Sequence, residues 1–426
     1  MTAKIAILGA GISGLATAHR LSKDHDVTVF EAGPRAGGNI RTERIGIQGV
    51  GDCLVEWGPN GFLDNEPAML ALVRELGLES RVVTARDEAA RRMIWRAGRL
   101  HDLPANPRAF LTSGCLPLGA RLRVLFEPFA KAAPPDDVDE SIHAFASRRI
   151  GRAAADVLVD AFVTGVFAGD PGRLSVASAF PRLKKLELEY GSLFKGMKAK
   201  RSSGPGPGGT LTSFDNGLSV LIDELASRVN LKLNEPWERI EQRDFDRVIC
   251  TVPAARAAIA LDAEHHELAE TLRRIPTAPI AIVVAGFREP LDVPEAFGFL
   301  VPHGQGLRIL GTLYDSSIFA GRAPAGVRTF RTMIGGRRDA GAMEMTDDEL
   351  CELAARELRQ VWGTYPDPVF TRVIRHSLGI AQYEAGHAGI VARTEELSPG
   401  WLTLAGSSYR GVAINACVKE AMATRA

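Results

Sequence analysis

The stretch that decides the fold covers residues 3–33 and reads AKIAILGAGISGLATAHRLSKDHDVTVFEAG. An apolar run leads into Gly9, Gly11 and Gly14, a helical pattern follows, and a second apolar run ends at Glu31. In a GxGxxG turn between strand and helix, the first glycine permits the tight turn and the second lets a pyrophosphate approach the backbone. The third lets the helix pack closely on the strand. The stretch therefore predicts a βαβ unit that binds a dinucleotide.

Two features after the glycine turn sharpen this prediction. Glu31 lies twenty residues after Gly11, at the end of the second predicted strand. A carboxylate there can accept hydrogen bonds from both hydroxyls of an adenosine ribose, and it disfavours a 2′-phosphate. The next residues, EAGPRAGGNIRT, add a second glycine pair between Arg35 and Arg41. Such a pair suits a dinucleotide that extends beyond one βαβ loop, although glycines alone could simply serve packing.

Length and composition narrow the class of protein. A chain of 426 residues predicts two or three domains. Its 51 basic and 51 acidic residues cancel, so no basic field is available and nucleic acid is not an expected partner. Five cysteines, far apart and without CxxC spacing, indicate a reducing compartment and no metal site. The apolar runs are too short to span a membrane, so we expect a cytoplasmic protein.

The remainder of the chain alternates helical and strand patterns. Residues 109–200 are mainly helical, and KRSSGPGPGG at 200–209 predicts an exposed loop. Apolar runs from Pro279 to Gly336 alternate with turns, which is typical of an antiparallel sheet. A final strand, GWLTLAG, leads through small residues into a closing helix. Small residues between strand and helix indicate that another group approaches the backbone closely.

Several motifs together resemble one family. EAGPRAGGNIRT is similar to the FAD-binding superfamily of amine oxidases, phytoene desaturases and protoporphyrinogen oxidases. The later motifs resemble the protoporphyrinogen oxidase family over nearly the whole chain. They are VEWGPNGF (55–62), FVTGVFAGDPGRLSVASAFPRL (162–183), AFGFLVP (296–302), LGTLYDSSIFAGRAP (310–324), TMIGG (332–336), GIAQYEAGH (379–387) and LAGSSYRGVAINACV (404–418).

This resemblance implies an α/β fold in which a Rossmann-type FAD-binding domain is joined to an antiparallel-sheet substrate domain and a helical insert. The FAD-binding domain would comprise residues 1–85, 201–255 and 379–426. The substrate domain would comprise residues 86–108 and 256–378. Residues 109–200 would form the helical insert, which the resemblance associates with a membrane.

The implied activity is the oxygen-dependent oxidation of protoporphyrinogen IX to protoporphyrin IX in haem biosynthesis. Successive two-electron transfers to FAD, with reoxidation by oxygen, would give hydrogen peroxide. Such chemistry needs no nucleophile, so no catalytic side chain is predicted. The alternatives are a coproporphyrinogen III oxidase of the same fold, an amine oxidase or carotenoid desaturase, and a porphyrin-binding homologue without turnover. Peripheral contact with the inner face of the cell membrane and a homodimer are further expectations.

By motif matching, the resemblance places FAD contacts mainly on the two glycine-rich turns, the turn at residues 58–61 and the last strand-to-helix junction. The matched residues are Gly9, Ala10, Gly11, Ile12, Ser13, Gly14, Glu31, Ala32, Arg35, Gly38, Asn39, Gly58, Pro59, Asn60, Gly61, Trp237, His376, Val412, Ala413 and Ile414. Trp237 has an equal alternative as an ordinary packed aromatic.

The substrate residues implied by the resemblance are fewer. Arg92 matches the arginine that pairs with a propionate, for which a guanidinium fork is suited. Leu313 and Met333 match apolar positions on either side of the macrocycle, and Gly165 matches a place where backbone meets substrate. Arg92 could instead be a solvated member of a basic cluster, and the apolar pair could be core. His387 is expected to be structural.

The chain departs from the family pattern at four places near the expected flavin. Family members commonly carry Trp at His376, Pro at Ala381 and Asp at Ala416. Only ERIEQRDFDR separates Trp237 from the next strand, where relatives usually insert a β-hairpin. These departures predict a weaker sheet beneath the adenine and weaker FAD binding.

Overall fold

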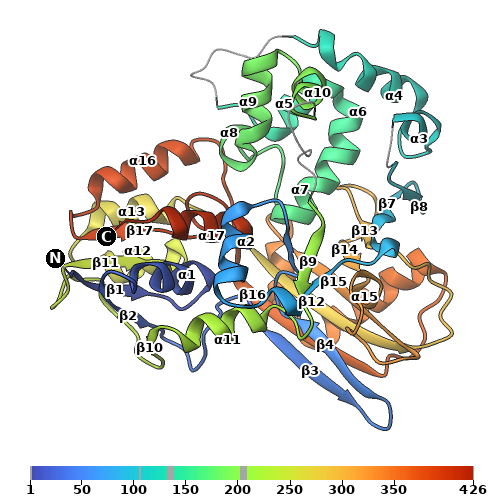
Figure 1. The fold of residues 1–426 in the computed structure, drawn as a ribbon. Coiled ribbons are helices and arrows are strands. Elements are labelled where there is room, and N and C mark those ends of the chain that lie inside the picture. The colour runs from blue at the N-terminus through green and yellow to red at the C-terminus, as the bar shows by residue number, and fades with distance from the viewer. Residues whose placement is uncertain (1, 105–106, 132–138, 202–208, 426) are drawn as a thin grey trace.

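Two large sheets and a separate group of helices make up the molecule (Figure 1). The computed structural model describes residues 2–104, 107–131, 139–201 and 209–425. The exposed loop predicted at residues 200–209 falls largely on residues 202–208, outside the described residues.

The first sheet is parallel throughout and collects strands from three distant parts of the chain. Its order is β10-β2-β1-β11-β17, with the N-terminal strand in the centre. These five strands are β1 (Lys4–Leu8), β2 (Asp26–Phe30), β10 (Asn230–Lys232), β11 (Arg247–Cys250) and β17 (Leu402–Leu404). The parallel sheet built on the first βαβ unit confirms the predicted fold class.

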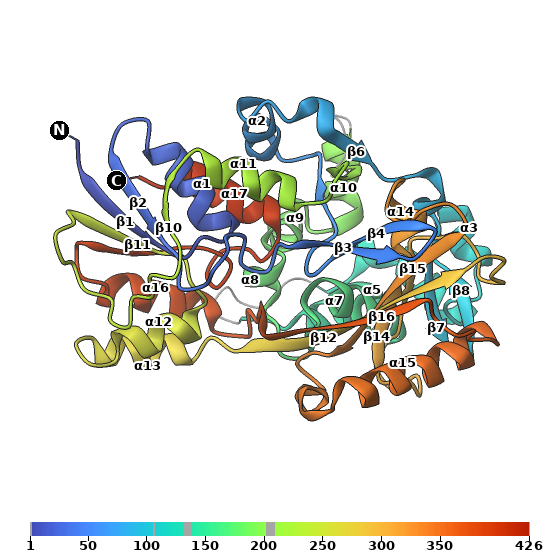
Figure 2. The same ribbon diagram turned by 90° about the horizontal axis from the view of Figure 1, so that it is seen from below.

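Helices cover both faces of the parallel sheet because alternate strand residues point to opposite sides. Ile5 and Ile7 share one core with α1 (Ile12–Leu21), α2 (Pro67–Glu75), α11 (Ser219–Ser227) and α17 (Ile414–Ala423). Ala6 and Leu8 share the other core with α12 (Ala254–Leu261), α13 (His266–Arg273) and α16 (His387–Leu397). Figure 2 shows the two helical layers on either side of the strands.

The second sheet has seven strands in the order β16-β12-β15-β14-β13-β7-β8. It is antiparallel as predicted, except that β13 pairs with β7 in parallel. One face packs on α15 (Asp347–Trp362), and the other, with Ile282, packs against Val55. The strands are β7 (Arg92–Arg96), β8 (Arg99–Asp102), β12 (Thr277–Arg288), β13 (Gly298–Leu300), β14 (Ile309–Leu313), β15 (Val327–Gly335) and β16 (Phe370–Ala381).

Small elements connect the two sheets. The hairpin of β3 (Thr42–Ile47) and β4 (Gly51–Glu56) extends from the parallel-sheet side across the second sheet (Figures 1 and 2). A three-stranded sheet combines β5 (Phe62–Leu63), β9 (Leu211–Phe214) and β6 (Val82–Thr84). The short helix α14 (Asp315–Ile318) follows β14 directly. Because β4 ends at Glu56, the turn at residues 58–61 follows it and lies between the two sheets.

The helical group stands at the top of Figure 1. Glu127 and Arg149 form an ion pair inside this group. The pair is buried, since the two residues expose 0% and 1% of their surface. Among the described residues, no helix has both the length and the apolar character needed to span a bilayer. The group contains α3 (Pro107–Thr112), α4 (Leu118–Leu125), η3 (Glu127–Phe129), α5 (Ile142–Ile150), α6 (Arg152–Ala154), η4 (Ala155–Val159), α7 (Asp160–Phe167), α8 (Val176–Ala179), α9 (Pro181–Tyr190) and α10 (Leu193–Arg201).

Candidate cofactor and substrate site

The three glycines of the first turn have three different surroundings. Gly9 has a φ of +97°, a backbone conformation that L side chains rarely adopt. A Cβ on Gly14 would lie 2.0 Å from the Gly9 carbonyl oxygen, so this glycine lets α1 pack against the strand end. A Cβ on Gly11 would meet nothing within 4 Å. Gly11 therefore faces open space at the N-terminus of α1, where free backbone N–H groups can bind phosphate.

Glu31 lies beside this turn. Its carboxylate oxygens accept hydrogen bonds from the backbone N–H groups of Ala10 and Gly33, each at 2.9 Å. The carboxylate therefore stands at the carboxyl end of β2, within reach of the first glycine turn. A carboxylate at that place is suited to hold a ribose.

Arg35 shapes the second glycine turn. Its guanidinium donates to the carbonyl oxygens of Gly38, at 2.8 Å, and Ala36, at 3.0 Å. Burial, with a smaller contribution from Arg41, lowers the pKa of Arg35. The backbone N–H of Gly37 donates to the Ala10 carbonyl at 2.7 Å, so the two glycine turns are joined directly.

The turn at residues 58–61 approaches neighbouring backbone so closely that its glycines are required. A Cβ on Gly58 would lie 2.3 Å from the Asn39 carbonyl oxygen, and a Cβ on Gly61 would lie 2.4 Å from that of Thr212. Between them, the amide oxygen and nitrogen of Asn60 are buried and have no hydrogen-bond partner in the part of the chain that the structure describes. Buried polar atoms are normally satisfied, so this amide fits a site that a ligand completes.

Trp237 belongs to an aromatic cluster at the end of β2. Its ring lies 5.2 Å from that of Phe30 and 6.0 Å from that of Phe245, and the Arg243 guanidinium stacks over it at 3.9 Å. The backbone N–H of Glu235 donates to the Glu31 carbonyl, which places this segment next to the carboxylate that is predicted to bind the ribose. Phe245, in the short segment between Trp237 and β11, packs on Phe30 of β2. The parallel sheet keeps its five strands in unbroken order.

The last strand-to-helix junction places small residues at the N-terminus of α17. Ala413 is the N-cap of α17, and Ile414 is buried in the core shared with α1. Gly411 has a φ of +138°, and its Cβ would lie 2.3 Å from the Cβ of Ala416. The side chain of Ala416 is therefore in close contact with the backbone of Gly411 in this junction. Val412, in the same segment, packs on the aromatic core of the helical group.

His387 is held by structural contacts. Its Nε2 donates to the Tyr409 carbonyl at 2.9 Å, and its ring stacks on Tyr383 at 4.1 Å. Burial lowers the pKa of His387, so the neutral form is favoured. The hydroxyl of Tyr383 in turn donates to the Ser407 carbonyl at 2.7 Å. These contacts agree with the structural role predicted for His387.

Three of the four residues predicted to contact substrate, namely Arg92, Leu313 and Met333, lie on one face of the seven-stranded sheet. Gly298 of β13 lies opposite both Arg92 of β7 and Leu313 of β14. Met333 lies on the next strand, β15, opposite Gly311 of β14. Residues opposite each other on paired strands share a face. The sheet therefore brings the predicted cation and both apolar residues together.

The surroundings of these residues differ. Arg92 is exposed, and its guanidinium lies 4.9 Å from the ring of Phe297. Met333 packs in the core between the sheet and the turn region. Gly165 of α7, in the helical group, lies against the sheet. A Cβ on this residue would lie 3.0 Å from Leu300 of β13, so glycine allows the close contact.

Two buried charged residues of this face were not predicted from the sequence. Arg331 lies opposite Leu313 and is 2% exposed, and its Nε pairs with Asp315 Oδ2 at 2.6 Å. Burial raises the pKa of Asp315, and the neighbouring Arg331 opposes that rise. The one available sequence signal was an arginine within an apolar strand pattern.

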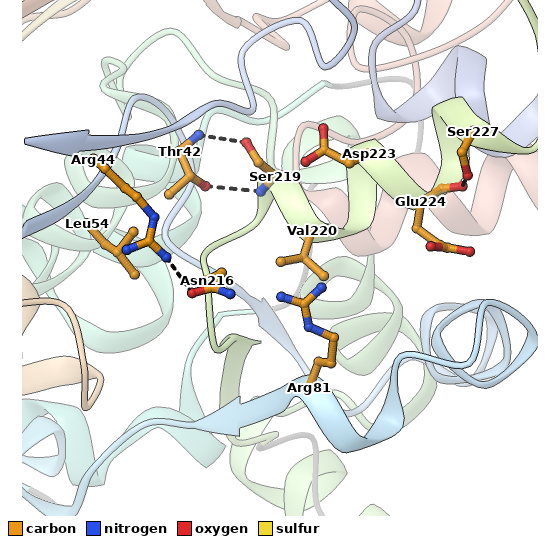
Figure 3. A pocket seen from close by; sticks show the side chains of 10 residues that line it. All are labelled: Thr42, Arg44, Leu54, Arg81, Asn216, Ser219, Val220, Asp223, Glu224 and Ser227. Carbon is orange, nitrogen blue, oxygen red and sulfur yellow. Dashed lines mark hydrogen bonds between the residues drawn. The ribbon is translucent and has the colours of Figure 1, made fainter. Parts of the chain in front are cut away.

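A separate groove of about 650 Å³ lies between the β3–β4 hairpin and α11 (Figure 3). Most of its polar side chains are hydrogen-bonded to other groups of the protein. Thr42 and Ser219 exchange two hydrogen bonds, and Arg44 donates to the Asn216 amide oxygen at 2.6 Å. Arg81 binds Asp215 through two guanidinium nitrogens. None of the ten side chains drawn in Figure 3 is a predicted site residue.

Fold and site together define a dinucleotide-binding oxidoreductase, and comparison with known proteins identifies its family. The family model for flavin-containing amine oxidoreductases matches residues 12–424. The chain is 30% identical to the chloroplastic protoporphyrinogen oxidase of Oryza sativa, over 99% of this chain and 87% of that protein. It is also 30% identical to protoporphyrinogen oxidase of Homo sapiens, over 98% and 96% respectively.

Solved structures show the same fold. A crystal structure from Exiguobacterium sp. 255-15 superposes with a TM-score of 0.85 at 24% identity, covering 99% of this chain and 98% of that one. Cyclohexylamine oxidase from Brevibacterium oxydans superposes with a TM-score of 0.68 at 18% identity, covering 99% and 98%.

The chain therefore belongs to the flavin-containing amine oxidoreductase family, and within it to the group that contains the protoporphyrinogen oxidases. It is an FAD-dependent oxidoreductase. Its own residues fit the cofactor, with open space at Gly11, a carboxylate at Glu31 and an unpartnered amide at Asn60.

Proposed function

We propose that the protein oxidises protoporphyrinogen IX to protoporphyrin IX in haem biosynthesis, with molecular oxygen as the final acceptor and hydrogen peroxide as the product. The observation that carries the proposal is the sheet face on which exposed Arg92 and apolar Leu313 and Met333 lie together, in a chain related over its full length to proteins of that name. When bound, FAD supplies the two-electron acceptor that side chains cannot provide.

The proposed roles of the chain's residues follow from their positions. Arg92 binds a propionate, since its guanidinium is exposed at the edge of the face and can form a bidentate pair with a carboxylate. Leu313 and Met333 present apolar surface to the macrocycle, and Gly165 lets α7 lie close to the sheet. The buried amide of Asn60 is available to hydrogen-bond where cofactor and substrate meet.

The cofactor residues of the proposal are those predicted from the sequence. The glycine turns and the N-termini of α1 and α17 hold the phosphates and the ring system, and Glu31 holds the ribose. Trp237 flanks the adenine side, because its segment runs beside Glu31. His376 is next to the proposed flavin contacts, because its Nε2 donates to the carbonyl oxygen of Trp57, the residue before the turn at 58–61.

The charges near Arg92 favour protoporphyrinogen over coproporphyrinogen, which carries more carboxylates. Arg91 points to the opposite face of the sheet from Arg92, where it pairs with Asp102 at 2.8 Å, and Arg86 is paired with Glu88 at 2.8 Å. These neighbouring guanidiniums are already engaged with carboxylates, so they offer little to additional propionates.

One experiment tests the activity. Purified protein is examined for its flavin absorption, and porphyrin fluorescence is followed in air with each porphyrinogen while hydrogen peroxide is measured. Faster oxidation of protoporphyrinogen with one peroxide per two electrons is expected. Faster oxidation of coproporphyrinogen would transfer the function to that substrate. A flavin-loaded protein that oxidises neither would indicate a binding homologue or another oxidase.

We also propose a cytoplasmic protein that touches the inner face of the cell membrane through its helical group. Exposed apolar side chains on α4 and η3, above all Phe129 at 82% exposure, support this contact. All five cysteines are free, which fits a reducing compartment. Light scattering of the purified protein tests the homodimer that remains part of the proposal.

The proposed domain division follows the predicted boundaries with one change. The FAD-binding domain would contain residues 1–85, 201–255 and 379–426, the substrate domain residues 86–108 and 256–378, and the helical domain residues 109–200. We propose to move residues 256–273 into the FAD-binding domain, because α12 and α13 share a core with β1 and β11.

A further inference from the structure

Side chains of the second sheet hold the backbone directly before and at the start of the turn that carries Asn60. Arg331 Nη1 donates to the carbonyl oxygens of Glu56 and Gly58, each at 2.9 Å. His376 Nε2 donates to the carbonyl oxygen between them, that of Trp57, at 2.7 Å. Three consecutive carbonyls thus receive hydrogen bonds from β15 and β16, on the opposite side of the interface between the two sheets.

The arrangement around Arg331 is fixed by burial. Arg331 and its ion-pair partner Asp315 expose 2% and 3% of their surface. A buried guanidinium is costly unless charges and acceptors surround it, so this side chain has little freedom to move.

The Glu56 side chain is held as firmly as its carbonyl. Its carboxylate accepts hydrogen bonds from the backbone N–H of Leu218 at 2.8 Å and from the Thr42 hydroxyl at 2.9 Å. The buried Arg322 lies 3.6 Å from the same carboxylate and donates to the Ser213 hydroxyl at 2.7 Å. The segment from Glu56 to Gly58 is therefore tied both to the parallel-sheet side and to the second sheet.

Arg331 also occupies a defined place relative to the proposed substrate residues. It lies opposite Leu313, and Met333 follows two residues later, so all three share one face of the sheet. Strand β15, which is proposed to present Met333 to the macrocycle, thus also hydrogen-bonds through Arg331 to the turn expected to contact the flavin.

We propose that Arg331, together with His376, is a positioning residue for the oxidation reaction. It fixes the turn at residues 58–61 against the substrate-facing sheet and so sets the distance and orientation between cofactor and porphyrinogen. Arg331 acts through the backbone of Glu56 and Gly58 and does not itself bind substrate. The inference rests on the proposed function for its substrate and adds the residues that align the reacting partners.

The test compares Arg331→Met and Arg331→Lys with a matched control on the same strand. Arg328 is 5% exposed and donates to the carbonyls of Val293 and Pro294, away from the turn. In Arg331→Met we expect a shifted flavin absorption band, weaker FAD binding and a kcat lowered about tenfold or more, with a smaller change in KM. Arg331→Lys should recover part of the kcat, and Arg328→Met should change only thermal stability.

A second pair of variants keeps the test usable if Arg331→Met does not fold. His376 is partly buried, so His376→Gln, which keeps a donor, and His376→Leu, which removes it, are expected to fold. The leucine variant should shift the flavin band and lower kcat, and the glutamine variant should do so less. Unchanged flavin spectrum, FAD affinity and kcat in folded Arg331→Met or His376→Leu would overturn the inference.

The flavin measurements separate this inference from the proposed function. FAD affinity and the absorption band are recorded without porphyrinogen, so they report on the turn even if wild-type protein oxidises no porphyrinogen. Inactive wild type with variant-dependent flavin spectra would reject the substrate and leave the positioning role supported. If the wild type is active but the substitutions change neither the flavin spectra nor kcat, the proposed function would stand and the positioning role would be rejected.

Discussion

We expect single glycines of the first turn to differ in their effects on stability and on cofactor binding. The space around Gly11 is open within 4 Å, whereas a Cβ on Gly14 would clash with the Gly9 carbonyl. Gly11→Ala should therefore keep the stability of the wild type but lower FAD affinity, because its methyl group occupies the path of the pyrophosphate. Gly14→Ala should lower the free energy of unfolding by about 1–3 kcal/mol through overpacking.

Denaturant unfolding of the FAD-free proteins and FAD titration measure the two effects. Gly119 offers a control, since its Cβ would also meet nothing within 4 Å but it lies in α4, outside the predicted cofactor site. Gly119→Ala should preserve FAD affinity. Full FAD affinity in Gly11→Ala would exclude the proposed approach of the pyrophosphate at that residue.

At Arg92 the expected effect is on substrate binding. Arg92→Met keeps much of the side chain's apolar length but removes the guanidinium, so KM for the porphyrinogen should rise about tenfold or more while kcat changes little. Arg91→Met is the matched control, because Arg91 precedes Arg92 and is paired with Asp102. Steady-state kinetics with both variants measures the difference, and an equal KM in the two would remove Arg92 from the substrate site.

The same residues show what sequence can predict. The turn that contains Gly9, Gly11 and Gly14 depends on local backbone chemistry, so the spacing of the glycines was sufficient to predict it. Arg331 was not predictable, because its acceptors are backbone carbonyls 273 and 275 positions away in the sequence. A carbonyl carries no side-chain signature, so nothing in the sequence around Glu56 points to an arginine.

Within the helical group, one carboxylate organises several elements. Glu127 accepts hydrogen bonds from the Ser192 hydroxyl at 2.6 Å and from the backbone N–H groups of Leu193 and Phe194 at the start of α10. Arg149 of α5 pairs with the same carboxylate. Burial alone would raise the pKa of Glu127, but these hydrogen bonds together lower it. The ionised form therefore ties η3, α5 and α10 together.

The lowered pKa of Glu127 gives a pH dependence of known sign. Since the folded-state pKa lies below the unfolded value of about 4.3, its contribution is complete above that pH and is lost as pH falls towards the folded value. Hydrogen exchange at the start of α10 should therefore accelerate below about pH 4.3, beyond the intrinsic pH dependence of exchange. Glu127→Gln should exchange faster at neutral pH and lose most of this dependence.

Glu349 offers a control for acid effects on helices elsewhere. Its carboxylate completes a capping box with Thr346 at the start of α15, outside the helical group. Glu349→Gln should leave exchange at α10 unchanged at every pH. Equal protection of α10 in wild type and Glu127→Gln at neutral pH would show that the carboxylate does not hold these elements together.

Elements were predicted from the sequence where their signals are local. The antiparallel character of residues 279–336 was readable because apolar runs alternate with turns. The parallel pairing of β13 with β7 was not, because the two strands are about 200 residues apart and pairing direction has no local signal. The packing of α12 and α13 on the parallel sheet has no local signal either, since an apolar helix face does not indicate which sheet it covers.

At the scale of the molecule, the proposed site lies where three chain regions meet. The parallel sheet supplies the glycine turns, the second sheet supplies Arg92, Leu313 and Met333, and α7 brings Gly165 from the helical group. The turn at residues 58–61 joins the first two regions through Arg331. A helical group so close to the site can give a poorly soluble macrocycle a path from a membrane to the sheet, which makes its outer surface the last feature to test.

That surface carries an apolar stripe. Leu118, Leu122 and Leu125 follow helical spacing on one side of α4 and are exposed by 59%, 45% and 40%. The stripe continues through Phe126, which joins α4 to η3, to Phe129 of η3, and the two exposed rings lie 6.4 Å apart. Large apolar side chains gathered on one surface are typical of a helix that lies in a membrane interface.

Substitution of this stripe should weaken membrane binding without affecting the flavin. Each large apolar side chain that enters the interface contributes about 1.5–3 kcal/mol, so Leu122→Ser with Phe126→Ser and Phe129→Ser should lower vesicle affinity at least a hundredfold. Cosedimentation with vesicles of phosphatidylcholine and phosphatidylglycerol measures this affinity. Ile259→Ser is the control, because Ile259 is 65% exposed on α12, on the parallel sheet. It should bind vesicles like the wild type, whereas equal binding by the triple variant would show that the helical group does not contact the membrane through α4 and η3.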